Sequence, residues 1–307
     1  DSNTVMDQSN FNISLSETTD GGTTISTSFE IVDEGTVSAD DDNAIKLTFT
    51  DGSALELLNA GSAAGTHAVA VPGAGGEQGI AGTSTNNAPG DLDFGAGSTA
   101  LGVEWHSAAD FLADGLKMSA SWSTDSGAAA GATARLDNSW GIGATYVTEA
   151  GDTKITIGGG VASGDVVTSD TAGSSNDKAG MNVGLSAVTG ALTIGVGYGD
   201  GDSFVANNAG VTVNQNVDGS VMKVGASYVT GDLTLAVGVT SGEAADYTFS
   251  SPTTAEDSND STSASVTYAV ASGVSAVVGY TQVDQNNEGS STTDGGSAWY
   301  VGATMSF

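Results

Sequence analysis

Apolar residues alternate with small or polar residues along most of this chain. Near its C-terminal end Trp299, Val301, Ala303, Met305 and Phe307 occupy every second position, and the residues between them are mostly small or polar. A period of two places successive side chains on opposite sides of the backbone. The pattern therefore predicts a strand with one apolar face and one polar face.

The same alternation recurs in pairs of segments joined by short turns. Residues 181–198 and 222–239 show it most clearly, and each of these pairs turns at a Thr-Gly dipeptide. Glycine at such a position suits a tight hairpin. Further short turns are expected at 19–22, 51–52, 149–152 and 271–273. The pattern predicts about fifteen strands of roughly ten residues, the length with which a tilted strand crosses a bilayer.

The connections between these hairpins are long, acidic and rich in Asn, Ser and Thr. They fall at 33–43, 125–138, 164–177, 201–218, 242–260 and 285–296. Short turns on one side and long loops on the other are typical of a transmembrane barrel. The polar face carries mostly Gly, Ser, Thr and Asn, as a water-filled lumen would, and few of the Lys, Glu and Arg residues of a soluble β-protein. We therefore predict an all-β, antiparallel up-and-down barrel in one domain, residues 1–307, with its apolar faces toward lipid.

Composition excludes several classes of function. The 307 residues include 45 Gly and no Cys, and 6 basic against 37 acidic residues give a net charge of −31. Such a charge repels nucleic acid. The two histidines, His67 and His106, have no Cys partners and no zinc-ligand spacing, and no catalytic motif is evident. An enzyme is therefore not expected.

Short stretches of this sequence resemble a known family. The C-terminal Tyr-Val-Gly-Ala-Thr-Met-Ser-Phe at 300–307 resembles the closing strand of bacterial outer-membrane porins, and residues 11–32 and 141–160 resemble strands of alphaproteobacterial, Rhodobacter-type general porins. The resemblance implies a sixteen-stranded barrel with short periplasmic turns and long external loops. It also implies a homotrimer in the outer membrane, in contact with lipid and lipopolysaccharide, that lets small hydrophilic solutes diffuse passively.

The strand count is one short of that family. The first family strand would precede Ser9, and residues 1–8 resemble the loop that follows it. Either this strand is missing from the chain or residues 1–8 form an atypical strand. Closure of the barrel depends on which of these holds.

The resemblance also assigns a pore constriction to residues 62–98, as a loop folded into the barrel. Its Gly and Pro residues favour irregular backbone, and the alternative is a loop that stays outside. In this family basic residues on the wall face acidic residues on the loop. The expected loop carboxylates are Glu77, Asp91 and Asp93, and the expected wall residues, all at lumen-facing positions, are Lys46, Lys117, Lys223, Glu56, Glu104 and His106. The family's arginine cluster is absent, so we expect the pore to favour cations.

Acidic clusters are candidate calcium ligands, since Ca²⁺ prefers oxygen atoms. They are Asp40, Asp41 and Asp42, and Asp200 with Asp202 in a Gly-Asp-Gly-Asp segment expected to form a loop. The alternative is that these side chains are only solvated. An acidic, calcium-dependent surface-layer or secreted structural β-protein is the competing functional hypothesis. A calcium solenoid would repeat Asp at fixed offsets, whereas this chain repeats hairpins.

Overall fold

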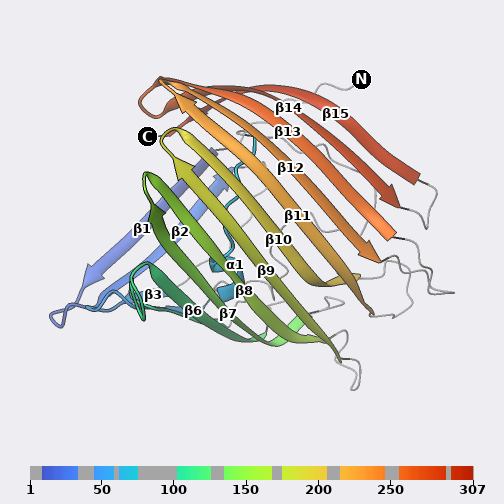
Figure 1. The fold of residues 1–307 in the computed structure, drawn as a ribbon. Coiled ribbons are helices and arrows are strands. Elements are labelled where there is room, and N and C mark those ends of the chain that lie inside the picture. The colour runs from blue at the N-terminus through green and yellow to red at the C-terminus, as the bar shows by residue number, and fades with distance from the viewer. Residues whose placement is uncertain are drawn as a thin grey trace.

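The computed structural model describes residues 9–33, 45–58, 62–74, 102–125, 135–167, 175–205, 215–245, 256–287 and 292–306. Fifteen strands form one sheet in these residues, together with one short helix, α1 (Ala63–Thr66) (Figure 1). The strands are β1 (Ser9–Thr18), β2 (Thr24–Asp33), β3 (Ile45–Thr48), β4 (Ala54–Leu57), β5 (Gly102–His106), β6 (Leu116–Asp125), β7 (Arg135–Ala150), β8 (Thr153–Val167), β9 (Ser175–Thr189), β10 (Leu192–Val205), β11 (Gln215–Thr230), β12 (Leu233–Ala245), β13 (Glu256–Ala271), β14 (Val274–Asn287) and β15 (Thr292–Met305).

Each strand pairs in antiparallel fashion with the next strand in the chain, so the sheet is an up-and-down meander. The predicted fold class is confirmed. The tight turns fall where glycine permits a left-handed backbone, as at Gly231 between β11 and β12, where φ is 58°. In the turn between β3 and β4, the hydroxyl and backbone N–H of Ser53 donate to Asp51 and lower the pKa of that carboxyl.

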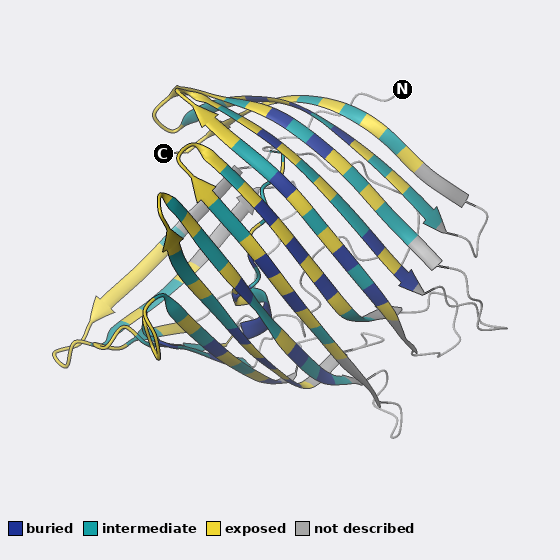
Figure 2. Cartoon of the chain, in the orientation of Figure 1, coloured by how far each residue is buried: buried dark blue, intermediate teal, exposed yellow. Residues whose placement is uncertain are grey.

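The two faces of the strands differ in burial as the alternation predicts (Figure 2). On β12 the side chains of Val237 and Val239 are 53% and 50% exposed, whereas Ala236 between its apolar neighbours is 7% exposed. Ser265 on β13 and Thr281 on β14 are also buried, at 6% and 0%. Among the described side chains no Leu, Ile, Phe or Trp is buried. The exposed apolar face is therefore the outer face, and the face of small and polar residues is the lumen face.

The strands are longer on one side of the sheet than the sequence pattern predicts. Strands β7–β15 have 13 to 16 residues, whereas β3 and β4 have 4 each and β5 has 5. Strand β10 extends to Val205, so the expectation that Asp200 and Asp202 lie in a loop is wrong. Past Tyr198 the outward-facing residues of β10 are Asp200 and Asp202 instead of apolar side chains. The hydrophobic alternation therefore ends there, although β10 stays paired with β11.

The sheet has two edges, β1 and β15, and no pairing joins them among the described residues. The side chains of Trp299 and Val301 on β15 are 78% and 84% exposed, more than Val278 on the neighbouring strand at 43%. An odd number of antiparallel strands leaves β1 and β15 running in the same direction. A ring of wholly antiparallel pairs needs one more strand, which agrees with the expected shortfall of one. Residues 1–8 lie outside the described part of the chain.

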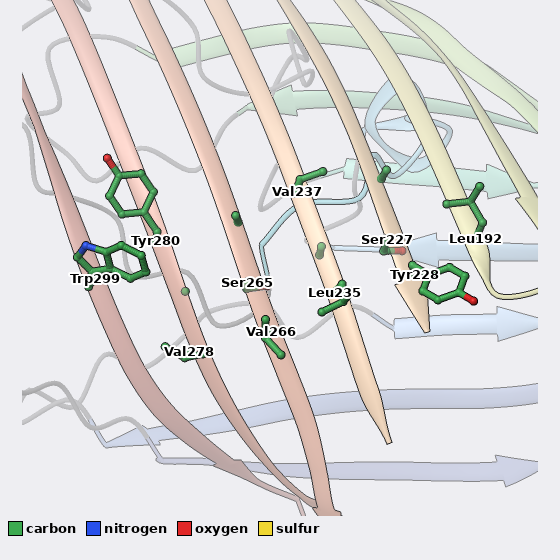
Figure 3. Close-up of a pocket in the computed structure, with 14 residues that line it drawn as sticks. Leu192, Ser227, Tyr228, Leu235, Val237, Ser265, Val266, Val278, Tyr280 and Trp299 are labelled. Atoms are coloured by element: carbon green, nitrogen blue, oxygen red, sulfur yellow. The ribbon is translucent and has the colours of Figure 1, made fainter. Parts of the chain in front are cut away.

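Aromatic side chains lie on the outer face at two levels, one beside the short turns and one at the middle of the long strands. Tyr280 and Trp299 are side by side on β14 and β15, with ring centroids 4.9 Å apart, and Tyr228 lies near the turn of β11 (Figure 3). Leu192, Leu235, Val237, Val266 and Val278 complete a shallow apolar depression on the same face. Aromatic residues at two levels around an apolar belt are typical of the membrane interfaces of a barrel. None of the described helices is long and apolar enough to cross a membrane.

Candidate functional site: the lumen wall and the inner segment

Residues 62–74, here called the inner segment, lie against the lumen face of the sheet. The segment starts with α1, whose residues Ala63 and Ala64 are buried, and α1 contacts β6, β7, β8 and β9 (Figure 1). Beyond α1 the segment has no regular structure and passes over β10, β11 and β12. Irregular backbone is tolerated at membrane depth where it is covered by protein or lines water. The inner segment meets that condition because the lumen wall lies beneath it.

Hydrogen bonds attach the start of the inner segment to the strands. The Ala63 N–H donates to Ser121 Oγ on β6 at 2.9 Å, and Asn182 Nδ2 on β9 donates to the Ala64 carbonyl oxygen at 3.0 Å. The Thr66 hydroxyl donates to Glu104 Oε1 on β5 at 2.7 Å. The first two bonds satisfy backbone groups of α1 that a one-turn helix leaves without partners. The three bonds connect the start of the segment to β5, β6 and β9.

Glycines on the lumen face give the inner segment room to lie flat. A glycine stripe crosses six neighbouring strands, β7–β12, and consists of Gly143, Gly158, Gly160, Gly184, Gly195, Gly225 and Gly238. A Cβ atom at Gly158 would lie 2.6 Å from the His67 carbonyl oxygen, and one at Gly184 would lie 2.7 Å from Val69 Cβ. At Gly225 it would overlap the Pro72 carbonyl oxygen. Any side chain at these positions would push the segment into the lumen.

A charged cluster lies on the wall where the inner segment begins. Lys46 Nζ on β3 is 2.6 Å from Glu56 Oε1 on β4, and His106 Nε2 on β5 is 3.4 Å from the same oxygen. His106 Nδ1 is 3.8 Å from Glu104 Oε1. The Glu104 side chain is 1% exposed, and no Lys or Arg lies within salt-bridge distance of it among the described residues. We call Lys46, Glu56, Glu104 and His106 the wall cluster.

A hydrogen-bonded chain connects the wall cluster to the inner segment. Ser119 Oγ on β6 lies 3.0 Å from His106 Nδ1 and 2.9 Å from His67 Nε2. His67 Nδ1 in turn lies 2.6 Å from Thr145 Oγ1 on β7. His67 is 5% exposed and follows directly after α1. These hydrogen bonds hold the buried His67 ring between β6 and β7.

Four of the expected wall residues, Lys46, Glu56, Glu104 and His106, come together in the wall cluster. Lys117 on β6 and Lys223 on β11 lie at lumen-facing positions outside it. The predicted loop carboxylates Glu77, Asp91 and Asp93 lie outside the described residues, as do residues 75–98 of the predicted constriction. Their roles stay predictions.

Of the candidate calcium ligands, one cluster lies outside the described residues and the other lies on β10. Asp40, Asp41 and Asp42 lie outside the described residues. Asp200 accepts a hydrogen bond from the Tyr198 hydroxyl at 2.8 Å, and Asp202 accepts one from the Ala179 N–H at 2.9 Å. Asp200 and Asp202 lie two and four residues after Tyr198, so their side chains are on the outer face of β10. They are at the strand end far from the short turns. Calcium binding there stays a prediction.

Sequence reasoning missed the residues that seat the inner segment. Thr66, Ser119 and Asn182 are ordinary polar residues in an Asn, Ser and Thr-rich chain, so nothing marks them. The sequence marked His67 only as a possible zinc ligand, for which it offered no second ligand at a suitable spacing. The glycine stripe did leave a signal, because glycines recur at lumen-facing positions in the middle of consecutive strands between 141 and 238. Such a run indicates close approach of another backbone.

The chain matches one protein-family model along almost its full length. That family is described as Gram-negative porin, and the match covers residues 1–306. No curated protein matches the chain by sequence. The match supports the porin prediction and lends nothing to the surface-layer alternative.

Solved structures of outer-membrane proteins share the fold. OmpT of Vibrio cholerae in its trimer form has a TM-score of 0.60 at 15% identity, over 96% of this chain and 91% of that chain. The anion-selective porin from Comamonas acidovorans has a TM-score of 0.61 at 11% identity, over 96% and 87%. A mutant of the Rh. blastica porin has a TM-score of 0.54 at 15% identity, over 98% and 90%. With the match over residues 1–306, these likenesses lead to one conclusion: the chain belongs to the Gram-negative porin family and is a bacterial outer-membrane channel for passive diffusion.

Proposed function

We propose that the pore passes small hydrophilic solutes without a catalytic step and favours cations over anions. The main support for this proposal is the wall cluster, in which two carboxylates, Glu56 and Glu104, lie beside one ammonium group, Lys46. Because Lys46 is already paired with Glu56, the cluster has one carboxylate more than it has ammonium groups. The net charge of −31 acts in the same direction. A channel wall of one sign raises the local concentration of the opposite ions.

We further propose that the constriction is built on the inner segment and continues through residues 75–98. The hydrogen bonds of Ala63, Ala64 and Thr66 support this, because they hold irregular backbone inside the barrel. In this proposal Glu77, Asp91 and Asp93 extend from the segment into the pore, opposite Lys117 and Lys223 on the wall. Solutes are then filtered by size and fixed charge.

The selectivity is tested with the full chain in a planar bilayer under a KCl gradient. The zero-current potential is expected to have the sign of a cation-selective pore. Glu104→Gln, which keeps an oxygen for the Thr66 hydroxyl, should reduce the potential because it removes the uncompensated charge. Glu17→Gln on β1, exposed and outside the cluster, is the matched control and should leave it unchanged. An anion-selective sign in the unaltered protein would falsify the proposal.

We propose that the channel is a homotrimer whose subunits meet at β1–β5. Strands β3, β4 and β5 have 4, 4 and 5 residues, or about 13–17 Å at the rise of a strand. The apolar band of a barrel is about 25 Å tall, so these described strands are too short to face lipid alone. Ile25, Ile45 and Phe49 nevertheless expose apolar side chains there. A second copy of the chain would cover this part of the wall.

We also propose that calcium bridges the outer-face carboxylates to each other and to lipopolysaccharide. Asp202 on β10 lies directly opposite Asp218 on β11, and Asp260 on β13 lies opposite Asp284 on β14. Like charges directly opposite in a ladder are destabilising. A divalent cation would remove that repulsion and attract the phosphate groups of the lipid.

A further inference from the structure

The wall cluster contains a combination of atoms that its ion pairs do not fully use. Glu56, Glu104 and His106 each present a ligand atom, and these atoms all lie within 4.8 Å of one another. It is the one such group of three metal-ligating side chains in the part of the chain that the structure describes. Carboxylate oxygen and imidazole nitrogen together form a ligand set for Zn²⁺ and similar divalent ions.

The His106 Nε2 atom gives a second observation that points to a ligand. It is buried, and it makes no hydrogen bond. It lies 3.4 Å from Glu56 Oε1, and two ligands of a tetrahedral ion are about 3.3 Å apart. The other ring nitrogen, Nδ1, lies 3.0 Å from Ser119 Oγ. A metal-binding histidine usually has such a partner for its second nitrogen, which orients the ring.

The charge balance of the cluster favours a further cation. Two carboxylates are set against Lys46, and with a neutral imidazole the cluster carries one excess negative charge. Glu104 is almost fully buried, and a buried carboxylate without a paired cation is costly. The Lys46 side chain is 46% exposed, so its ammonium can move into lumen water when another cation approaches Glu56.

We propose that Glu56, Glu104 and His106 form a binding site on the lumen wall for a divalent transition-metal ion of the Zn²⁺ type. His106 Nε2 and one oxygen from each glutamate bind the ion, and water completes the coordination. Lys46 competes with the ion for Glu56. Because Thr66 donates to Glu104, the site lies at the point where the inner segment meets the wall. The proposal depends on this geometry and is independent of the cation preference.

The test is a calorimetric titration of the refolded full chain with ZnCl₂ in detergent, with excess Mg²⁺ to occupy sites made of oxygen atoms alone. We expect one Zn²⁺ per chain. His106→Asn and Glu56→Gln should each weaken binding by more than the roughly 10- to 100-fold that loss of an outer-shell partner costs. Lys46→Met should tighten binding because the competing ammonium is gone, which a merely structural role of the cluster would not produce. Glu17→Gln should bind as the unaltered protein does.

Folding of each variant is checked by the shift in gel mobility on heating. The proposal is overturned when the folded, unaltered protein and Lys46→Met both bind no Zn²⁺. It is equally overturned when folded His106→Asn and Glu56→Gln bind as tightly as the unaltered chain, because the ion then occupies other carboxylates. The titration measures no current, so failure of the selectivity experiment leaves its outcome unaffected.

Discussion

At the scale of single residues, absent side chains are as important as present ones. The stripe from Gly143 to Gly238 leaves a shallow track in which the backbone of the inner segment lies against the strands. Hydrogen bonds from Thr66 and Asn182 then hold the start of the segment in place. The outer-face side chains were predictable from alternation alone, because their environment is simply lipid. The anchoring residues were not, because each depends on a contact with a segment distant in sequence.

A methyl group at Gly225 tests the role of the stripe. In Gly225→Ala the new Cβ overlaps the Pro72 carbonyl oxygen, so the inner segment must shift into the lumen. We expect a smaller single-channel conductance and a loss of about 1–3 kcal/mol in the free energy of unfolding, the usual cost of overpacking. Gly302→Ala is the control, since its Cβ would meet only Val277 Cγ1 at an ordinary 3.5 Å. Equal conductance in the two variants would contradict the role assigned to the stripe.

At the scale of elements, each long strand passes through two environments. The outer face of β10 is apolar from Leu192 to Tyr198 and then carries Asp200 and Asp202. The sequence pattern located the first part and took the second for a loop, because alternation of hydrophobicity fades where lipid ends. Backbone hydrogen bonds do not depend on which side chains face outward, so the strand continues. Strand ends are therefore the least predictable part of this fold.

The carboxylates at these strand ends predict a dependence on calcium. Asp202→Asn removes the like charge opposite Asp218 and keeps an acceptor for the Ala179 N–H. Without calcium the variant should be more stable than the unaltered protein by about 0.2–1 kcal/mol. With calcium that difference should disappear or change sign, because the unaltered pair then holds an ion. Urea unfolding in vesicles containing lipopolysaccharide, with and without EDTA, measures both values, and identical curves in the four conditions would exclude the bridge.

At the scale of the whole molecule, the wall is uneven around its circumference. Long strands β7–β15 form one part, and the short strands β3–β5 form another. The sequence predicted the number of strands because turns recur regularly. It did not predict the short strands, because in the proposed trimer a strand that faces a second subunit is as apolar as one that faces lipid. Only the lengths observed in the structure separate the two.

Two isoleucines distinguish a subunit contact from a lipid contact. Ile25 on β2 and Ile157 on β8 are both 43% exposed on the outer face. Ile25→Gln is expected to shift the assembly from trimer to monomer, because the polar amide is buried at the contact without a partner. Ile157→Gln should leave the assembly intact. Light scattering in detergent measures the mass, and a trimer that survives in both variants would place the contact elsewhere.

The hydroxyl between the two histidines has only one hydrogen atom to give. If an ion takes the lone pair of His106 Nε2, the ring must carry its hydrogen on Nδ1 and donate to Ser119 Oγ. Ser119 then donates to His67 Nε2, and His67 donates through Nδ1 to Thr145. The tautomer of the buried His67 imidazole is thus set by ion binding at His106. Nuclear magnetic resonance of the ring nitrogens of His67 would register occupancy at His106 although the ion never touches that ring.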